Sequence, residues 1–190
     1  MGAVPIATAE DLTHATRVLI HGATGAGKST AAARIGQILD LPVHLADEEI
    51  GFLPASQAVW TNRPPEEMRR IAARVASGDR WILDSSYGAF RDEILPRAEV
   101  IIGLDYPRWL SLARLLRRTA TRVRDGRLIC NGNRETLRQQ FGRDSIIVWH
   151  FSSFARKRRT MRGWAQDPAG PPTILVSGPA ELEQLIAAIS

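Results

Sequence analysis

One short segment constrains the fold of this 190-residue chain more than any other. Residues 22–29 read GATGAGKS and match the pattern G-x-x-x-x-G-K-[ST] of a phosphate-binding P-loop. The apolar run before it, residues 17–21, predicts a buried strand, and residues 28–39 after it predict a helix with one apolar face. A strand, a glycine-rich turn and a helix in this order are the context that the motif requires. We therefore expect a phosphate site at the end of the first strand.

The residue types in this loop suit a triphosphate. Glycines allow backbone N–H groups to turn toward phosphate oxygens, and the start of the following helix adds positive partial charge. We expect Lys28 to contact the β- and γ-phosphates, Ser29 to offer its hydroxyl to Mg²⁺, and Thr30 to support the α-phosphate. The predicted ATP-binding residues are Gly22, Ala23, Thr24, Gly25, Ala26, Gly27, Lys28, Ser29 and Thr30.

The rest of the chain alternates between apolar runs and helical patterns. Further strands are expected over 43–46, 80–84, 100–105 and 173–177. Further helices are expected over 66–77, 107–120, 134–141, 144–160 and 180–189, with turns over 121–133. This alternation is typical of an α/β fold with a parallel sheet. We expect a single domain over 17–190, preceded by a loose leader, 1–16.

Acidic residues follow three of the predicted strands, where an open α/β sheet binds its ligands. Asp84 occupies the position of a Walker-B-type acid and is a candidate Mg²⁺ ligand, directly or through water; the alternative is a turn cap. Asp47 is a candidate to orient the acceptor or a metal-bound water. Because Glu48 and Glu49 follow it, a solvated acidic patch is the alternative. Asp105 is expected to be structural.

The basic residues are concentrated in one segment. The chain has a net charge of +5, yet residues 108–162 hold 14 arginines and one lysine against three acids, a net charge of +12. Such a segment implies an anionic partner. Arg114 and Arg118 are four residues apart, so they share a helix face and are candidates to stabilise charge during phosphoryl transfer. A second cluster comprises Arg156, Arg158, Arg159 and Arg162, and solvated helix faces are the alternative for both.

Other features narrow the class of protein. No apolar run approaches the roughly 20 residues of a membrane span, and residues 1–15 lack a secretory signal pattern. The single cysteine, Cys130, excludes an internal disulfide and shows no nucleophile context, so we expect a cytoplasmic protein. His21, His44 and His150 show no ligand spacing and are expected to be structural. Trp81, Trp109 and Phe154 are expected in the core, and Trp60 either there or in the acceptor region.

The chain resembles the small P-loop kinases of the nucleoside monophosphate kinase and shikimate kinase group, most closely the adenylate-kinase-related topology modulation (FlaR-like) proteins. The stretches that carry the resemblance are 17–41, 45–47, Trp60 with 63–68, 78–84 with Tyr87, and 104–110 with Arg114 and Arg118. The resemblance implies a three-layer α/β/α P-loop NTPase fold with a five-stranded parallel sheet in the order 2-3-1-4-5. It also implies an acceptor-binding segment at about 47–77, an arginine-rich helical lid at about 119–145, and an adenine site near 177–179. The sequence departs from the adenylate kinase pattern after Asp84, where Ser-Ser-Tyr replaces Gly-Phe-Pro.

These observations and the resemblance together lead to one main hypothesis. An ATP-dependent phosphotransferase would move the γ-phosphoryl group of ATP-Mg²⁺ to a small acceptor, with a nucleoside monophosphate as the first candidate. The residues expected to act in catalysis are Lys28, Arg114, Arg118 and Asp47, and those expected at the metal are Ser29 and Asp84. The alternatives are a kinase for a non-nucleotide metabolite or a nucleic acid 5′ end, and a nucleotide-dependent module that binds nucleic acid through residues 108–162. No membrane partner is expected, and the sequence does not identify the acceptor or the oligomeric state.

Overall fold

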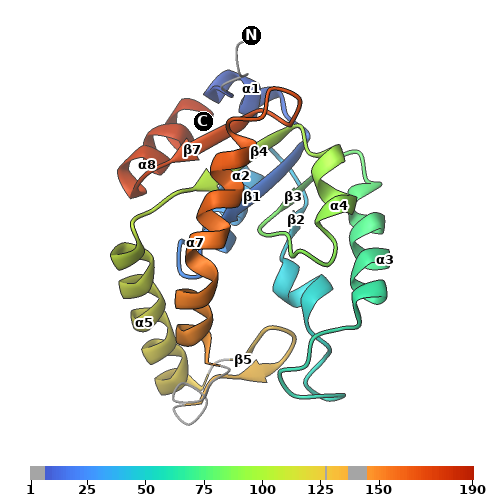
Figure 1. The fold of residues 1–190 in the computed structure, drawn as a ribbon, viewed down its shortest axis with the longest axis vertical. Helices are drawn as coiled ribbons and strands as arrows, with labels where there is room; N and C mark the ends of the chain where they lie inside the picture. The colour runs from blue at the N-terminus through green and yellow to red at the C-terminus, as the bar shows by residue number, and fades with distance from the viewer. Residues whose placement is uncertain (1–6, 127, 137–144) are drawn as a thin grey trace.

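The computed structural model describes residues 7–126, 128–136 and 145–190. Its centre is a five-stranded parallel sheet in the order β2-β3-β1-β4-β7, with helices on both faces (Figure 1). The strands are β1 (Arg17–Gly22), β2 (Val43–His44), β3 (Trp81–Leu83), β4 (Val100–Leu104) and β7 (Thr173–Val176). The expected α/β fold class is confirmed. With β7 counted as the fifth parallel strand, the order corresponds to the expected 2-3-1-4-5, and the labels differ because a hairpin intervenes.

The helices connect the strands in the expected alternation. They are α1 (Ala9–His14), α2 (Lys28–Ile38), the π-helical turn η1 (Asp47–Gly51), α3 (Pro65–Ala76), α4 (Arg91–Ile94), the 3₁₀ turn η2 (Leu95–Arg97), α5 (Arg108–Asp125), α7 (Ile146–Trp164) and α8 (Pro179–Ala188). A short antiparallel hairpin, β5 (Leu128–Ile129) with β6 (Asn133–Arg134), follows α5. No helix in the described part of the chain is both long and apolar enough to span a bilayer.

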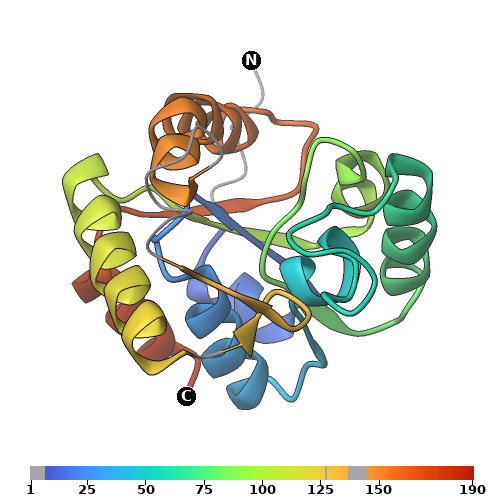
Figure 2. The same cartoon turned by 90° about the horizontal axis from the view of Figure 1, so that it is seen from below.

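Both faces of the sheet are buried, as in parallel sheets generally. Successive strand residues point to opposite faces, so Val18 and Ile20 join one core cluster while Leu19 joins the other. Residues of α1, α2 and α8 complete the first cluster, and residues of α3 and α4 complete the second. The strands run parallel, and their carboxyl ends therefore lie at one edge. Figure 2 views the molecule from this side.

The expectation of a loose leader over residues 1–16 is wrong for residues 9–14. These residues form α1, because Thr8 and Asp11 cap its start reciprocally through side chain and backbone. Leu12 is fully buried and belongs to the first core cluster. This part of the leader is therefore a packed element of the domain.

The region after α5 also differs from the expectation. The sequence predicts turns over 121–133, but α5 continues to Asp125, where Gly126 with a φ of +61° ends it. Asn131–Gly132, with φ values of 65° and 90°, supplies the left-handed turn that joins β5 to β6. The helix expected over 134–141 is absent from its described part, 134–136, and the remainder lies outside the described residues. The expected lid, 119–145, is thus in its described part a helix end followed by a hairpin.

The aromatic residues divide between core and surface. Trp81 and Phe154 are buried as expected, whereas Trp109 is 70% exposed and does not belong to the core. The prediction that Trp109 lies in the core is wrong, because Trp109 lies on the outer face of α5, away from the side that buries Leu115.

Candidate active site

The P-loop wraps tightly around the end of β1 because its glycines adopt conformations that other residues avoid. Gly25 and Gly27 have φ values of +87° and +95°. A Cβ atom on Gly25 would lie 2.2 Å from the carbonyl oxygen of Ser111, so α5 packs directly against the loop. Lys28 begins α2 and donates from Nζ to the carbonyl oxygen of Ala23 at 3.2 Å. The loop and its lysine therefore form one compact unit.

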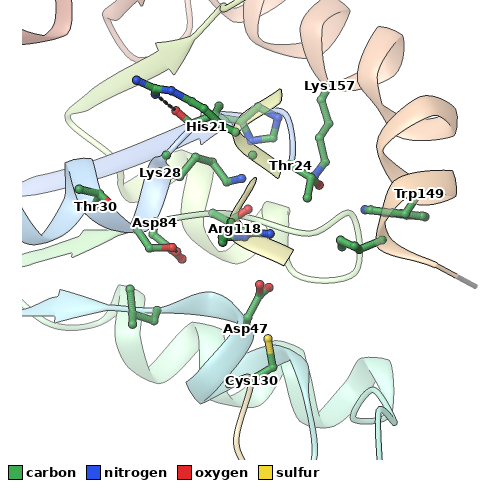
Figure 3. A pocket seen from close by; sticks show the side chains of 18 of the residues that line it. His21, Thr24, Lys28, Thr30, Asp47, Asp84, Arg118, Cys130, Trp149 and Lys157 are labelled. Atoms are coloured by element: carbon green, nitrogen blue, oxygen red, sulfur yellow. Dashed lines mark hydrogen bonds between the residues drawn. The ribbon is translucent and has the colours of Figure 1, made fainter. Parts of the chain in front are cut away.

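Lys28 lies between two carboxylates. Burial lowers the pKa of Lys28, while Asp84 and Asp47 act in the opposite direction. Figure 3 shows Lys28, Asp84, Asp47 and Arg118 around the same space. The structure therefore brings together, around the P-loop, residues that the sequence placed in separate segments.

Ser29 and Asp84, the two expected metal ligands, are in contact. The Ser29 hydroxyl donates to Asp84 Oδ2 at 2.5 Å, and the backbone N–H of Ala46 donates to Asp84 Oδ1 at 2.8 Å. Burial raises the pKa of Asp84, and both hydrogen bonds and Lys28 oppose this. Two oxygen ligands suit Mg²⁺, which keeps several waters and binds substrate phosphates. Within the described residues, no group of three or more His, Cys, Asp or Glu side chains could hold a metal without such help.

Asp47 begins η1 and faces the P-loop from the β2 side. It accepts a hydrogen bond from the hydroxyl of Tyr87, the residue that follows Asp84-Ser-Ser in the sequence. Burial raises the pKa of Tyr87, and Asp47 raises it further, so Tyr87 remains a hydrogen-bond donor. Gly51 allows this contact, since a Cβ atom there would lie 2.7 Å from the Tyr87 hydroxyl. The sequence analysis assigned no role to Tyr87.

Arg114 and Arg118 project from α5 toward the P-loop. Arg114 donates to the carbonyl oxygen of Ala26 at 3.4 Å, and its guanidinium carbon lies 5.5 Å from the ring centroid of Tyr106. Burial lowers the pKa of Arg118, and among the described residues its Nε has no hydrogen-bond partner. Arg122, one turn further along, pairs with the buried Glu135 at 3.6 Å. Both predicted arginines therefore lie at the site.

The β5–β6 hairpin is joined to η1 by hydrogen bonds and lines the same cleft as the P-loop. The carboxylate of Glu48 accepts from the backbone N–H groups of Cys130 at 2.8 Å and Asn131 at 2.5 Å. The Trp60 backbone N–H donates to Asn133 Oδ1 at 2.6 Å. Glu48 is therefore hydrogen-bonded within the fold. This differs from the alternative prediction of a solvated acidic patch at this position.

Helix α7 also lines the cleft. Its side chains form hydrogen bonds to the end of β4 and to the P-loop. Arg158 and Arg162 bind Asp105 at 2.6 and 2.8 Å, so Asp105 is structural as expected and these arginines are already paired. His150 Nδ1 lies 2.9 Å from the carbonyl oxygen of Thr24. Lys157 extends from α7 into the site (Figure 3). Lys157 was not among the predicted site residues, although it is one of the two lysines in a chain with 23 arginines.

Many of these groups line one cleft of about 1710 Å³. Its lining includes the predicted Lys28, Ser29, Asp47, Asp84, Arg114 and Arg118. It is wide enough for a nucleotide and a second small molecule, since ligand pockets commonly measure about 300–1,000 Å³.

The sequence matches no protein-family model and no curated protein. Its fold is shared by solved structures, among them the following two. A gluconokinase from Sinorhizobium meliloti 1021 is 17% identical, with 91% of this chain and 88% of that chain covered and a TM-score of 0.52. A shikimate kinase from Acinetobacter baumannii, solved in complex with shikimate, is 14% identical, with 96% and 94% covered and a TM-score of 0.55. At these identities the likeness concerns the fold, and the chain has the α/β fold of these two P-loop kinases.

Proposed function

We propose that this chain is a P-loop kinase that transfers the γ-phosphoryl group of ATP to a hydroxyl group of a small acceptor. The observation that carries this proposal is the contact between Ser29 and Asp84 beside Lys28, whose pKa is lowered by burial and raised by Asp84. A hydroxyl, a carboxylate and an ammonium at the end of a P-loop are the groups that hold a metal-bound triphosphate. Asp47 on the facing wall adds a group that a pure nucleotide-binding site does not need.

The residues divide the work of phosphoryl transfer between them. The P-loop backbone and Lys28 would hold the β- and γ-phosphates, and Ser29 and Asp84 would hold Mg²⁺, which neutralises phosphate charge when bound. Arg114 and Arg118 would stabilise the charge that develops on the transferred group. Arg118 suits this role because its buried guanidinium keeps an unbonded Nε among the described residues.

Asp47 would act on the acceptor. The acceptor hydroxyl oxygen forms a bond to the γ-phosphorus while the bond from that phosphorus to the bridging oxygen of ADP breaks, and ADP keeps the electron pair. The hydroxyl proton passes to the Asp47 carboxylate, which Tyr87 holds in place. Positioning and charge stabilisation account for the catalysis, with no covalent enzyme intermediate.

Three classes of acceptor can be compared: a hydroxyl-bearing acid, a nucleoside monophosphate and a nucleic acid. Gluconokinase and shikimate kinase are named for hydroxyl-bearing acids, and a metabolite of this kind is the first candidate here. A nucleoside monophosphate is the second candidate, because Phe52, Trp60 and Tyr87 line the same cleft and offer aromatic faces to a base. It would accept the phosphoryl group on an oxygen of its own phosphate, so no hydroxyl proton would pass to Asp47. A nucleic acid partner is less favoured, because Arg158 and Arg162 form ion pairs with Asp105 within the fold.

ADP formation tests the proposal. Purified protein is incubated with ATP and Mg²⁺ and, separately, with gluconate, shikimate, AMP and an oligonucleotide with a free 5′ hydroxyl. We expect acceptor-dependent ADP formation with one class, and its loss in Lys28→Ala. Arg159→Met serves as a matched control, because Arg159 is exposed and lies outside the cleft lining. Acceptor-dependent turnover that survives Lys28→Ala would contradict the proposed site.

A further inference from the structure

Positively charged side chains gather where α4 and α7 line the cleft. Arg91 begins α4, and Arg156 and Lys157 lie on α7. In the described part of the chain, none of the three forms an ion pair, whereas Arg158 on the same helix pairs with Asp105. Cations that line a cleft without an ion-pair partner indicate an anionic ligand.

These three groups are close enough to influence one another. Burial, with smaller contributions from Lys28, Arg156 and Arg91 and against the opposing effect of Asp47, lowers the pKa of Lys157 to about 7. Burial also lowers the pKa of Arg91; Asp92 opposes this shift, and Arg156 adds to it. The cluster thus repels itself in the absence of a ligand, and a bound anion would relieve this repulsion.

Buried nitrogen atoms next to the cluster also lack partners. Both ring nitrogens of His21, which is 1% exposed, and the Nε of Arg91 have no hydrogen-bond partner among the residues described. Trp164 packs against both residues, with ring centroids 4.9 Å apart for His21 and the Arg91 guanidinium carbon 5.4 Å from its ring. Packing therefore holds these side chains in place while their polar atoms remain unused. Buried polar atoms without partners are costly and call for an explanation such as a ligand.

The position of the cluster assigns it to the acceptor. Arg114 contacts Tyr106, and both line the cleft together with Pro179, which belongs to the segment expected to meet adenine. Lys157 and Asp47 line the same cleft and both point into it (Figure 3), so the cluster shares this space with the carboxylate that would receive the acceptor proton. An acceptor with its hydroxyl group at Asp47 would thus direct its other end toward α4 and α7.

We propose that His21, Arg91, Arg156 and Lys157, the α4–α7 anion site, bind a carboxylate or phosphate group of the acceptor and thereby select an anionic acceptor over a neutral alcohol. This inference rests on the proposed kinase function for the identity of the ligand as acceptor. The shared chemistry is an oxyanion that accepts hydrogen bonds from the guanidinium and ammonium groups.

The lysine content of the chain allows a test that reports on each site separately. Lys28 and Lys157 are its two lysines. The full chain is labelled near pH 7 with a small amine-reactive reagent, and modification at each lysine is quantified by mass spectrometry. The probes are ATP-Mg²⁺, gluconate, inorganic phosphate and the neutral polyol sorbitol, each titrated alone, and gluconate and sorbitol also in the presence of ATP-Mg²⁺.

We expect ATP-Mg²⁺ to protect Lys28, and gluconate or phosphate to protect Lys157 at concentrations at which sorbitol does not. If gluconate protects Lys157 at a lower concentration than phosphate does, the site prefers a carboxylate; the reverse order indicates a preference for phosphate. Arg91→Met should raise the protecting concentration by about 10-fold or more, since a charge-assisted hydrogen bond is lost. Arg159→Met, the matched control on the exposed side of α7, should leave it unchanged.

Three results would overturn the inference: equal protection by sorbitol, protection of Lys157 by ATP-Mg²⁺ alone, or anion protection that Arg91→Met leaves intact. The proposed function fails separately, if ATP-Mg²⁺ does not protect Lys28 and ADP does not form. In that case, protection of Lys157 by gluconate or phosphate would still support the anion site itself.

Discussion

Asp84 holds its carboxylate between two groups that are distant from it in the sequence. One oxygen accepts from the Ser29 hydroxyl and the other from the Ala46 backbone. Burial raises its pKa, while these partners and Lys28 favour the ionised form. A single carboxylate, fixed on both sides and next to the P-loop, is thus available for a metal ion.

Asp84→Asn preserves the shape of the side chain and removes its charge. We expect the Mg²⁺ concentration for half-maximal ADP formation to rise about 10- to 100-fold, the usual cost of disturbing a metal site. Asp79→Asn, on an exposed residue outside the cleft, is the control. An unchanged magnesium requirement in Asp84→Asn would remove this residue from the metal site.

Lys157 makes binding of an anionic acceptor sensitive to pH. Its pKa of about 7 reflects burial together with Lys28, Arg156 and Arg91, against Asp47. The protonated form binds an anion, so acceptor affinity should fall as pH rises through 7, by up to about 10-fold per pH unit above it. Calorimetry with gluconate between pH 6 and 9 measures this. In Lys157→Arg the charge persists, and the profile should become flat. A wild-type affinity that is constant across this range would contradict the assignment.

Two short elements join parts of the molecule that the sequence keeps apart. The β5–β6 hairpin is attached to η1 through Glu48. The Glu48 carboxylate accepts hydrogen bonds from two backbone N–H groups in the turn of the hairpin. Helix α1 covers one end of the sheet and buries Leu12 completely. Both elements are therefore part of the folded domain, and the hairpin also lines the cleft through Leu128, Ile129 and Cys130.

Glu48→Gln should loosen the hairpin. The amide side chain keeps one acceptor oxygen and loses the charge, so the amide hydrogens of Cys130 and Asn131 should exchange faster, and the free energy of unfolding should fall by about 1–3 kcal/mol. Hydrogen exchange and urea denaturation measure the two effects. Glu66→Gln, on an exposed residue of α3, is the control. Exchange at the hairpin turn that matches the wild type would show that Glu48 does not secure it.

Leu12→Ala tests α1 as a structural element. Truncating a fully buried leucine should lower the free energy of unfolding by about 2–5 kcal/mol, because transfer and cavity costs add. Glu10→Ala, on the exposed side of the same helix, should change it by less than about 0.5 kcal/mol. A Leu12→Ala variant as stable as the wild type would restore the leader interpretation of this segment.

At the scale of the whole molecule, the cleft combines residues that are contiguous in the sequence with residues that only the packing of the helices brings together. Mainly the contiguous residues and those at strand ends were predictable. The P-loop was predictable because its residues are contiguous, and Asp47 and Asp84 were predictable because parallel strands end at one edge. Lys157 and Arg91 were missed because only the docking of α7 and α4 brings them to the cleft. The rarity of lysine in the chain would have singled out Lys157.

Other misses have similar causes. The hairpin was missed because its strands have two residues each, too short for a periodic pattern. The Thr8 and Asp11 capping pair was a usable local signal for α1. Trp109 was misplaced because hydrophobicity alone does not say which face of α5 packs inward.

The central claim is that the end of β1 holds a metal-bound triphosphate, and calorimetric titration of ATP tests it most directly. The wild type should bind ATP with an affinity that rises when Mg²⁺ is added, and Lys28→Ala should lose at least about 10-fold in affinity, the loss of one charge-assisted contact. Absence of ATP binding by the wild type, with or without Mg²⁺, would contradict the claim and the kinase function that rests on it.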